Sequence, residues 1–274
     1  MIEAGFFDLD KTTIDPKGRA YDGLEVAFDG SPETFARTIL TARGYPRLQE
    51  AIGDNPFLAV SPGFPIGLEN GARIVDSDTF ENIYYHPLSI DERAAICDYI
   101  TTTEELRYVA FHPKEPRSKT MLWSPDPDEA ERLHNAYSHN ADVFSGDKQM
   151  LFQKINQHTP CMITCRTYSN EPRDLPEITF YSRNTTVNFM PEQPNKGTAL
   201  QMIADRQGLD LSNVMAAGND HNDIPMLSVE HLGYPVVVGT DMSEVMKTQL
   251  PEKTLYIPDP RKLGSYILKE VTRQ

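Results

Sequence analysis

Short apolar segments that end in polar loops mark both ends of the chain. Residues 2–7 are apolar and end at Asp8, a pattern typical of a buried strand that leads into a loop. Further strands are expected over residues 33–41, 214–217 and 236–238, and helices over 47–52, over 196–206 and through Met226. Asn195 stands ahead of the second helix as an N-cap. Strands that alternate with helices predict an α/β fold with a parallel, Rossmann-like sheet.

Residues 76–188 have a different pattern, in which extended segments and prolines alternate with two helices. The extended segments are Ile83–His86, Leu106–Phe111, Cys161–Thr167 and Ile178–Asn188. One helix is opened by Ser89 and Asp91, and the other by residues 125–128. We therefore predict an α+β unit over 76–188, inserted into an α/β core domain that consists of 1–75 and 189–274.

Composition and charge limit the kinds of molecule that we expect this protein to bind. The 274 residues include 40 acidic and 26 basic side chains, a net charge of −14. Such a charge repels nucleic acid and anionic membranes, so we expect neither as a partner. No apolar run approaches the roughly 18 residues of a membrane span, and the first residues lack the basic segment of a signal peptide. Three irregularly spaced cysteines point to a reducing compartment, and we expect a cytoplasmic protein.

Two carboxylates, Asp8 and Asp10, directly follow the first predicted strand. In open parallel sheets, ligands bind beyond the carboxyl ends of the strands. Two acids this close repel each other unless they share a cation or one of them stays protonated. Such an oxygen-rich corner suits Mg²⁺. An exposed turn with a helix-capping Asp would give the same local pattern, so this pair alone leaves both interpretations open.

A second acidic cluster follows another predicted strand. It contains Asn219, Asp220 and Asp223, and acids at two strand ends of one sheet can converge on one metal. Thr41 stands at a third strand end, where its hydroxyl can donate to a phosphate oxygen. Lys196 begins a helix, where the ammonium and the helix N-terminus both favour an anion. Taken singly, Thr41 could be structural and Lys196 a surface residue.

Together these motifs resemble the haloacid dehalogenase superfamily, and more narrowly its type IIB, Cof-like branch. That branch includes sugar-phosphate phosphatases, sucrose-phosphate phosphatase and mannosyl-phosphoglycerate phosphatase. The matching motifs are, in chain order, Asp8-Leu9-Asp10-Lys11-Thr12, Thr41-Ala42-Arg43, Asn70-Gly71-Ala72, Lys196-Gly197 and Gly218-Asn219-Asp220-His221-Asn222-Asp223. The resemblance implies the superfamily's α/β core with an inserted α+β cap domain of type C2B.

The resemblance also implies roles for these residues. It makes Asp8 the nucleophile that forms an aspartyl-phosphate, Asp10 the general acid and base, and Lys196 a catalytic cation. The phosphate-binding residues that it implies are Asp8, Thr12, Thr41, Arg43 and Lys196. The residues that it implies for the magnesium site are Asp8, Asp10, Asn219, Asp220 and Asp223.

Three positions depart from the branch's pattern. Lys11 and Ala42 replace glycines, and Asn219 stands where the fourth motif has its first Asp. An amide oxygen is still a possible magnesium ligand. We therefore expect Asp223 and one of Asn219 or Asp220 to face the metal, and the other to orient it through hydrogen bonds.

The expected function is that of a magnesium-dependent phosphatase, which acts on a small phosphate monoester such as a sugar phosphate. Two alternatives stay open: a phosphotransferase or phosphomutase of the same branch, and a binding protein on a degenerate scaffold, since Asn219 removes a usual metal ligand. Asn70, Arg166 and Arg183 are the candidate substrate contacts. His86, Arg117 and Lys119 are further cationic candidates in the inserted unit.

Overall fold

The chain forms two compact units. The computed structural model describes residues 2–31, 34–58, 60–168, 180–183, 185–191 and 193–272, with 180–183 described by their backbone. The first unit consists of Met1–Arg43, Arg47–Ile83 and Pro194–Gln274, and the second of Gly44–Pro46 and Tyr84–Gln193. Both ends of the sequence therefore build the first unit, and most of the middle builds the second.

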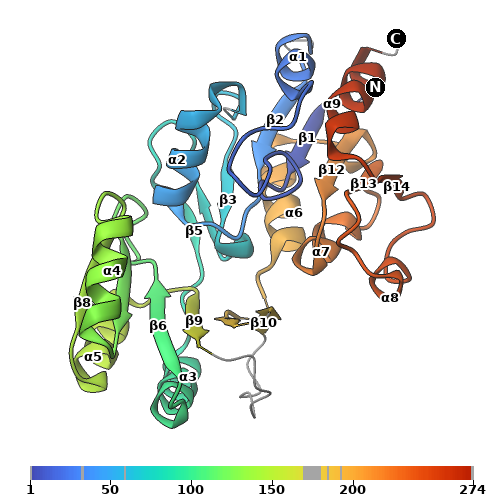
Figure 1. Ribbon diagram of the computed structural model, residues 1–274. Coiled ribbons are helices and arrows are strands. Elements are labelled where there is room, and N and C mark those ends of the chain that lie inside the picture. Colours follow the sequence, from blue (N-terminus) through green and yellow to red (C-terminus); the bar gives the residue numbers. More distant parts are fainter. Residues whose placement is uncertain are drawn as a thin grey trace. The chain divides into compact units, whose positions relative to one another are not determined.

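A parallel sheet forms the centre of the first unit (Figure 1). Its strands are β1 (Ala4–Phe7), β2 (Ala36–Ile39), β12 (Val214–Gly218), β13 (Tyr234–Val238) and β14 (Leu255–Ile257), in the order β14-β13-β12-β1-β2. Each neighbouring pair is parallel. The predicted α/β fold with a parallel core sheet is thus confirmed. Because β2 and β12 flank β1 on opposite sides, the carboxyl end of β1 is a topological switch point.

The helices of this unit are α1 (Leu24–Asp29), α2 (Tyr45–Asp54), α6 (Lys196–Gln207), α7 (Ile224–Leu227), α8 (Glu244–Lys247) and α9 (Leu263–Thr272). Helix α6 begins as the sequence predicts, because Asn195 Oδ1 accepts hydrogen bonds from the backbone N–H groups of Gly197 and Thr198 at 3.0 and 3.1 Å. It ends at Gly208, which has a positive φ of 67°. Helix α9 has no counterpart among the elements predicted from the sequence.

Strand β2 is shorter than the predicted 33–41, and residues 32 and 33 lie outside the described part of the chain. Its pairing with β1 ends at Phe7 and Ile39. The N–H of Leu40 still donates to the Phe7 carbonyl at 2.9 Å, and Leu40 also bridges to Gly67 of β3 (Ile66–Leu68). Strand β3 forms a small sheet with β4 (Arg73–Val75) and β5 (Asn82–Tyr85). The chain therefore leaves β1 just before Thr41.

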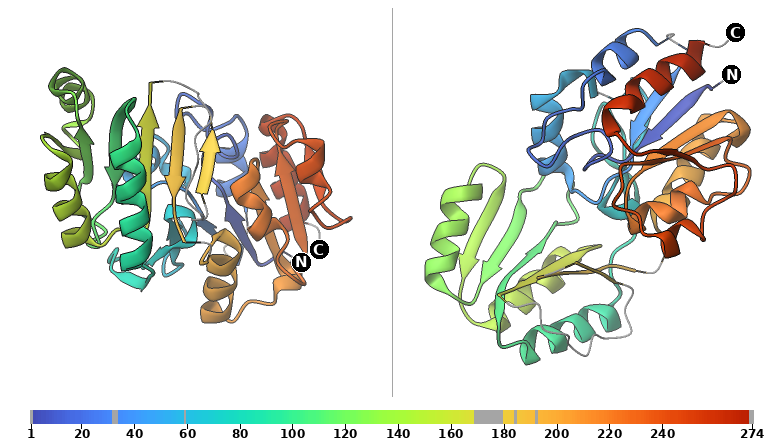
Figure 2. Two further views of the ribbon diagram at one scale, coloured as in Figure 1. Left: turned by 90° about the horizontal axis from the view of Figure 1, so that it is seen from below. Right: turned by 45° about the vertical axis from the view of Figure 1, so that its right-hand side comes forward.

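The second unit is an α+β structure with one mainly antiparallel sheet (Figure 2). Its strands are β6 (Leu106–Phe111), β7 (Thr120–Ser124), β8 (Ala141–Ser145), β9 (Ile163–Thr167), β10 (Phe180–Arg183) and β11 (Thr186–Phe189), in the order β10-β11-β9-β6-β7-β8. Its helices are α3 (Ile90–Thr102), α4 (Pro127–Tyr137) and α5 (Lys148–His158). Ile96 of α3 and Ile155 of α5 share one apolar core with Val109 and Ile163 of the sheet.

Local signals in this unit located some elements and missed others. Ser89 and Glu92 form the capping box that starts α3, and Asp126 caps α4. The sequence did not reveal β7, β8 or α5. Residues 178, 179 and 184 of the predicted strand 178–188 lie outside the described part of the chain. The described residues form two strands and not one, because Arg183 of β10 and Thr186 of β11 are antiparallel partners. Among the described residues no helix has both the length and the apolar character to cross a bilayer.

Candidate active site

The polar residues predicted from three strand ends meet at one edge of the first unit's sheet. Asp8 follows β1, Thr41 follows β2, and Asn219 follows β12. The backbone N–H of Asp8 donates to the carbonyl of Ala217 at 2.9 Å. This hydrogen bond extends the pairing of β1 with β12 by one residue beyond the end of β1. Adjacent parallel strands thus bring these residues together, although they are far apart in the sequence.

Lys196 stands between two buried carboxylates. Its Nζ lies 2.6 Å from Asp8 Oδ1 and 2.6 Å from Asp223 Oδ1. Lys196 and Asp223 are completely buried, and Asp8 is 5% exposed. Asn195 holds the first turn of α6, so the ammonium is presented from a fixed position. The three charges form a row with one uncompensated negative charge.

The surroundings of this row shift its protonation equilibria. Burial, which removes water from the carboxylate, and the nearby charge of Asp223 both raise the pKa of Asp8, whereas Lys196 lowers it. The net result of these effects is a pKa of about 7. Burial alone would lower the pKa of Lys196, but the two carboxylates outweigh it and the pKa lies above its ordinary value. The ammonium therefore remains charged at neutral pH, where the Asp8 carboxyl titrates.

Two threonines of the loop after β1 fix Asp8. Thr12 is fully buried, and its Oγ1 donates to Asp8 Oδ2 at 3.1 Å. Thr13 Oγ1 lies 3.2 Å from the Asp8 carbonyl oxygen and 3.1 Å from that of Leu9. Thr12 therefore orients the carboxylate and Thr13 the backbone. No motif in the sequence indicates this role for Thr13.

The carboxamide of Asn219 lies against the same loop. One terminal atom of the carboxamide lies 2.9 Å from the Asp10 carbonyl oxygen, 3.1 Å from Thr12 Oγ1 and 3.2 Å from Asp8 Oδ2. Because the carbonyl and the carboxylate can only accept hydrogen bonds, we assign this atom as the amide nitrogen. The residue is 4% exposed. The side chain that replaces the usual acid is thus in direct contact with the Asp8 carboxylate.

Asp223 organises the loop after β12. Its Oδ2 accepts from the backbone N–H groups of Asn219 and Asp220 at 2.8 and 3.0 Å, and its Oδ1 accepts from Lys196. The Asp220 side chain accepts from the His221 N–H at 2.8 Å, at the start of the short 3₁₀ helix His221–Asp223. Both acids are therefore engaged within the protein. Their predicted part in a metal site stays a prediction.

Asp10 forms a bidentate pair with Arg43. Nε and Nη2 of Arg43 lie 2.9 and 2.6 Å from the two carboxylate oxygens, and half of the Asp10 side chain is exposed. The sequence predicted both residues for the site but gave no signal that they pair. Thr41 is fully buried, and its Oγ1 accepts from the Arg43 N–H at 3.1 Å. The Thr41 hydroxyl proton can therefore be donated to another acceptor.

Asn70 connects two of the motifs. Its Oδ1 accepts from Asn222 Nδ2 at 2.8 Å, so the carboxamide predicted as a substrate contact holds the loop after β12. Asn70 has a φ of 57°, and Gly71 follows with a φ of 94°. A Cβ on Gly71 would lie 2.3 Å from the Asn195 carbonyl oxygen, so this close approach to the start of α6 requires glycine.

The cationic candidates of the second unit are dispersed. Arg166 lies on β9, paired with Tyr108 and Thr186, and strand alternation directs it away from the core residues Ile163 and Cys165. Lys119 Nζ donates to the Ser138 carbonyl at 2.7 Å, His86 Nδ1 lies 3.4 Å from the Tyr84 hydroxyl, and Arg117 is exposed. The side chain of Arg183 lies outside the described residues.

The oxygen atoms beside Asp8 suit a small divalent cation. In the described part of the chain, no three His, Cys, Asp or Glu side chains are grouped as a metal site. The Asp8 carboxylate, the Asp10 backbone carbonyl and the Asn219 carboxamide nevertheless converge. Magnesium takes carboxylate and carbonyl oxygens, so this donor set fits Mg²⁺ with one carboxylate and two neutral groups.

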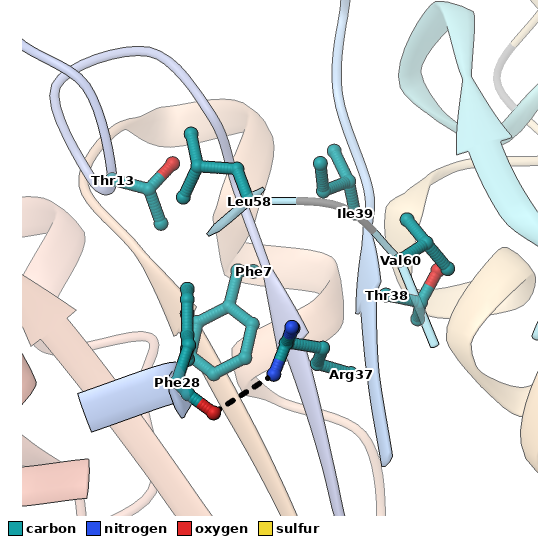
Figure 3. A pocket seen from close by; sticks show the side chains of 8 residues that line it. All are labelled: Phe7, Thr13, Phe28, Arg37, Thr38, Ile39, Leu58 and Val60. Carbon is teal, nitrogen blue, oxygen red and sulfur yellow. Dashed lines mark hydrogen bonds between the residues drawn. The ribbon is translucent and has the colours of Figure 1, made fainter. Parts of the chain in front are cut away.

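A small pocket lies beside the strand that carries Asp8 (Figure 3). It is lined by Phe7, Thr13, Phe28, Arg37, Thr38, Ile39, Leu58 and Val60. Arg37 Nη1 donates to the Phe28 carbonyl at 3.1 Å, and its guanidinium lies over the Phe28 ring. The carboxylates at the strand ends do not line this pocket. It therefore belongs to the packing behind β1.

Comparison with known proteins agrees with this geometry. Residues 6–249 match the family profile of the haloacid dehalogenase-like hydrolases. A stretch of 61 residues is 39% identical to "Putative phosphatase M6_Spy0533" of Streptococcus pyogenes serotype M6 and covers 22% of each chain. The match therefore spans about a fifth of that relative's length.

Solved structures share the fold over nearly the whole chain. BT1666 from Bacteroides thetaiotaomicron, described among phosphatases of the superfamily, has a TM-score of 0.71 at 18% identity, covering 99% of this chain and 95% of its own. The subclass IIB sugar phosphatase BT4131 has a TM-score of 0.72 at 16% identity and 98% coverage of both chains. TM0651 from Thermotoga maritima has a TM-score of 0.72 at 15% identity, covering 100% and 99%. At these identities the likeness establishes the fold.

Proposed function

The chain belongs to the haloacid dehalogenase-like hydrolases, and on that premise we propose that it is a magnesium-dependent phosphatase of small phosphate monoesters. The observation that carries the proposal is the buried row of Asp8, Lys196 and Asp223 at the switch point of the parallel sheet. A carboxylate held between a lysine and a threonine hydroxyl is fixed for attack on phosphorus.

Asp8 is the nucleophile in this proposal. Lys196 holds Oδ1 and Thr12 holds Oδ2, so the carboxylate cannot rotate. Its attack forms the bond from oxygen to phosphorus and breaks the bond from phosphorus to the alcohol oxygen, which yields an aspartyl-phosphate. Water then attacks that phosphorus, releases inorganic phosphate and restores the Asp8 carboxylate. Division into two displacements replaces one difficult hydrolysis.

Asp10 handles the protons in both displacements. It protonates the departing alcohol oxygen and then accepts a proton from the attacking water. Its carboxyl group is half exposed, and the planar fork of Arg43 fixes its orientation. This geometry supports a general acid and base that is positioned by a residue from the neighbouring strand end.

The substrate phosphate needs positive charge beside the buried row. Lys196, the hydroxyls of Thr12 and Thr41 and the guanidinium of Arg43 supply donors. The row already carries one uncompensated negative charge, and a phosphate monoester adds about two more. A bound Mg²⁺ would supply charge stabilisation there, held by the Asp8 carboxylate, the Asp10 carbonyl and Asn219. Asp220 and Asp223 would act through the loop that carries Asn219.

We propose that the second unit selects the substrate and that the molecule selected is a sugar phosphate or a similar small metabolite. Its support is the face of β9 that presents Arg166, next to Tyr108 and Thr186. A guanidinium beside a phenol and a hydroxyl suits a polar, anionic or hydroxylated small molecule. A cytoplasmic location is proposed with this substrate class.

The test is a panel of phosphorylated metabolites and one aryl phosphate, each assayed with Mg²⁺ and with EDTA. We expect hydrolysis that requires Mg²⁺, and a loss of at least about a thousandfold in Asp8→Asn, since an amide does not attack phosphorus. Asp205→Asn, an exposed change on α6, is the matched control. Metal-independent turnover, or Asp8→Asn with near normal rates, would reject the mechanism.

A further inference from the structure

The carboxamide of Asn219 lies where it can either donate hydrogen bonds to its neighbours or coordinate a cation. Its terminal group lies 2.9 Å from the Asp10 carbonyl oxygen and 3.2 Å from Asp8 Oδ2. These lengths are ordinary for N–H···O hydrogen bonds. A backbone carbonyl can only accept a hydrogen bond, so the group that faces Asp10 is the amide nitrogen.

The same spacing also suits two oxygens that share a cation. Magnesium binds its ligands at about 2.0–2.1 Å in an octahedron, and neighbouring ligands of an octahedron are then about 3 Å apart. A half-turn of the carboxamide exchanges nitrogen for oxygen without moving the rest of the side chain. An aspartate at this position lacks the nitrogen and has only the second of these arrangements.

We propose that Asn219 is an exchangeable group at the metal corner. Without a divalent cation its amide nitrogen joins Asp8 to Asp10 by hydrogen bonds, and with the cation the amide turns and its oxygen becomes a ligand. The proposal rests on the magnesium site of the proposed function. It deepens that function, because the substitution of Asn for Asp becomes a determinant of metal affinity.

Two consequences follow from the charges. The cation must displace hydrogen bonds and gains a neutral ligand in place of a carboxylate, so it binds more weakly than it would beside an aspartate. The metal-free protein is in turn more stable than an aspartate variant, because a carboxylate at 219 would face the Asp8 carboxylate across 3.2 Å.

Asp220 provides a matched control for the change in charge. Asp220→Asn preserves a good cap for the short 3₁₀ helix, since Asn and Asp cap equally well. The double change Asn219→Asp/Asp220→Asn moves one carboxylate by one position and leaves the net charge unaltered. Any difference between the double variant and the native chain therefore reports position, not total charge.

The experiment measures Mg²⁺ binding by calorimetry and thermal unfolding in EDTA for the native protein, both single variants and the double variant. We expect Asn219→Asp and the double variant to bind Mg²⁺ at least about tenfold more tightly and to unfold at lower temperature in EDTA. The double variant should bind Mg²⁺ more tightly than Asp220→Asn by the same factor as Asn219→Asp exceeds the native protein, and the exposed change Asp205→Asn should resemble the native protein. Equal affinities, or equal unfolding temperatures in EDTA, would overturn the proposal.

Failure of the proposed function gives a different result. If neither the native protein nor Asn219→Asp binds Mg²⁺, the magnesium site itself is wrong, and the exchange falls with it. A second measurement needs only the native protein, so it tests the proposal even if the variants do not fold. In the native protein, the side-chain NH₂ signals of Asn219 should be protected from solvent exchange in EDTA and lose that protection when Mg²⁺ is added. Signals that stay unchanged on saturation with Mg²⁺ would overturn the exchange alone.

Discussion

Arg43 holds both oxygens of Asp10, although the two residues follow different strands of the core sheet. The two contacts are 2.9 and 2.6 Å, and Arg43 also donates to the Arg47 carbonyl at 3.1 Å. The guanidinium is thereby fixed at both sides. The orientation of the proposed general acid is thus set by the segment after β2 and not by its own loop alone.

Removal of the contact between Arg43 and Asp10 should lower turnover by an amount that depends on the leaving group of the substrate. In Arg43→Met the Asp10 carboxyl loses its orientation, so turnover of sugar phosphates, whose alkoxide needs a proton, should fall about a hundredfold. Aryl phosphates with good leaving groups should lose much less. Steady-state assays with both substrates measure the ratio of the two losses in turnover.

The control for that ratio is Arg206→Met, an exposed change on α6 that removes the same charge. It should leave both rates near the native values. Asp10→Asn should show the same dependence on the leaving group as Arg43→Met. An equal loss for both substrate types in Arg43→Met would mean that the arginine serves the phosphate and not Asp10.

Asp8 makes metal-free stability depend on pH. Its folded-state pKa of about 7 lies above the ordinary 3.8, so the folded chain holds a proton that the unfolded chain has already lost between these values. Stability therefore falls as pH rises from about 4 to about 7 and is level above that range. Asp8→Asn cannot titrate there.

Thermal unfolding in EDTA from pH 4 to pH 8.5 checks this sign. The advantage of Asp8→Asn over the native protein should grow up to about pH 7 and then stay constant. The exposed variant Asp205→Asn provides the baseline. An advantage that shrinks as pH rises would contradict the raised pKa of Asp8.

Lys196 should be essential for stability as well as for activity. In Lys196→Met the buried carboxylates of Asp8 and Asp223 lose their common counter-charge, and the free energy of unfolding should drop by about 3–5 kcal/mol. Urea unfolding measures this loss. The exposed change Lys262→Met should alter stability by less than about 0.5 kcal/mol.

A second substitution separates charge from packing. Asn at 223 can still accept from the N–H groups of Asn219 and Asp220 while it removes one carboxylate, so Lys196→Met/Asp223→Asn should regain part of the lost stability. No recovery in the double variant would show that the single change acts through packing around the lysine stem.

Arg166 should affect substrate choice without affecting the chemical step. In Arg166→Met, KM for substrates that carry a carboxylate or a second phosphate should rise about tenfold or more, the equivalent of one charged hydrogen bond. The kcat for an aryl phosphate should stay unchanged. Arg132→Met removes an exposed arginine of the same unit and should change neither value. If Arg166→Met changed the kinetics of the aryl phosphate as much as those of the doubly charged substrates, Arg166 would not be a specificity residue.

Local chemistry let the sequence locate the strands and the helix that position the candidate site. An apolar run that ends in Asp8, and a second that ends before Asn219, identify two buried strands and the edge where their loops meet. Asn195 predicts the start of α6, and thereby the position of Lys196, because a capping side chain acts on the next few residues only. These features depend on neighbours in the sequence, so the sequence was sufficient to predict them.

Other features depend on partners that are distant in the chain. Strand β2 ends at Ile39, where Leu40 begins to pair with Gly67 of β3. Arg43, after β2, contacts Asp10, after the neighbouring strand β1. Helix α5 buries only Leu151 and Ile155, so its apolar signal is short. No local pattern records such contacts, because their free energy comes from surfaces that meet only after the sheet has formed.

The Asn219 carboxamide shows where the two sources of information divide. The sequence by itself determined that an amide replaces an acid in a motif at a strand end. Whether that amide presents its nitrogen or its oxygen depends on the Asp10 carbonyl and the Asp8 carboxylate, which only the tertiary structure brings within 3.2 Å. The physical reason is that hydrogen-bond direction is a property of the partner atoms, and those atoms belong to the loop after β1, at the other end of the chain.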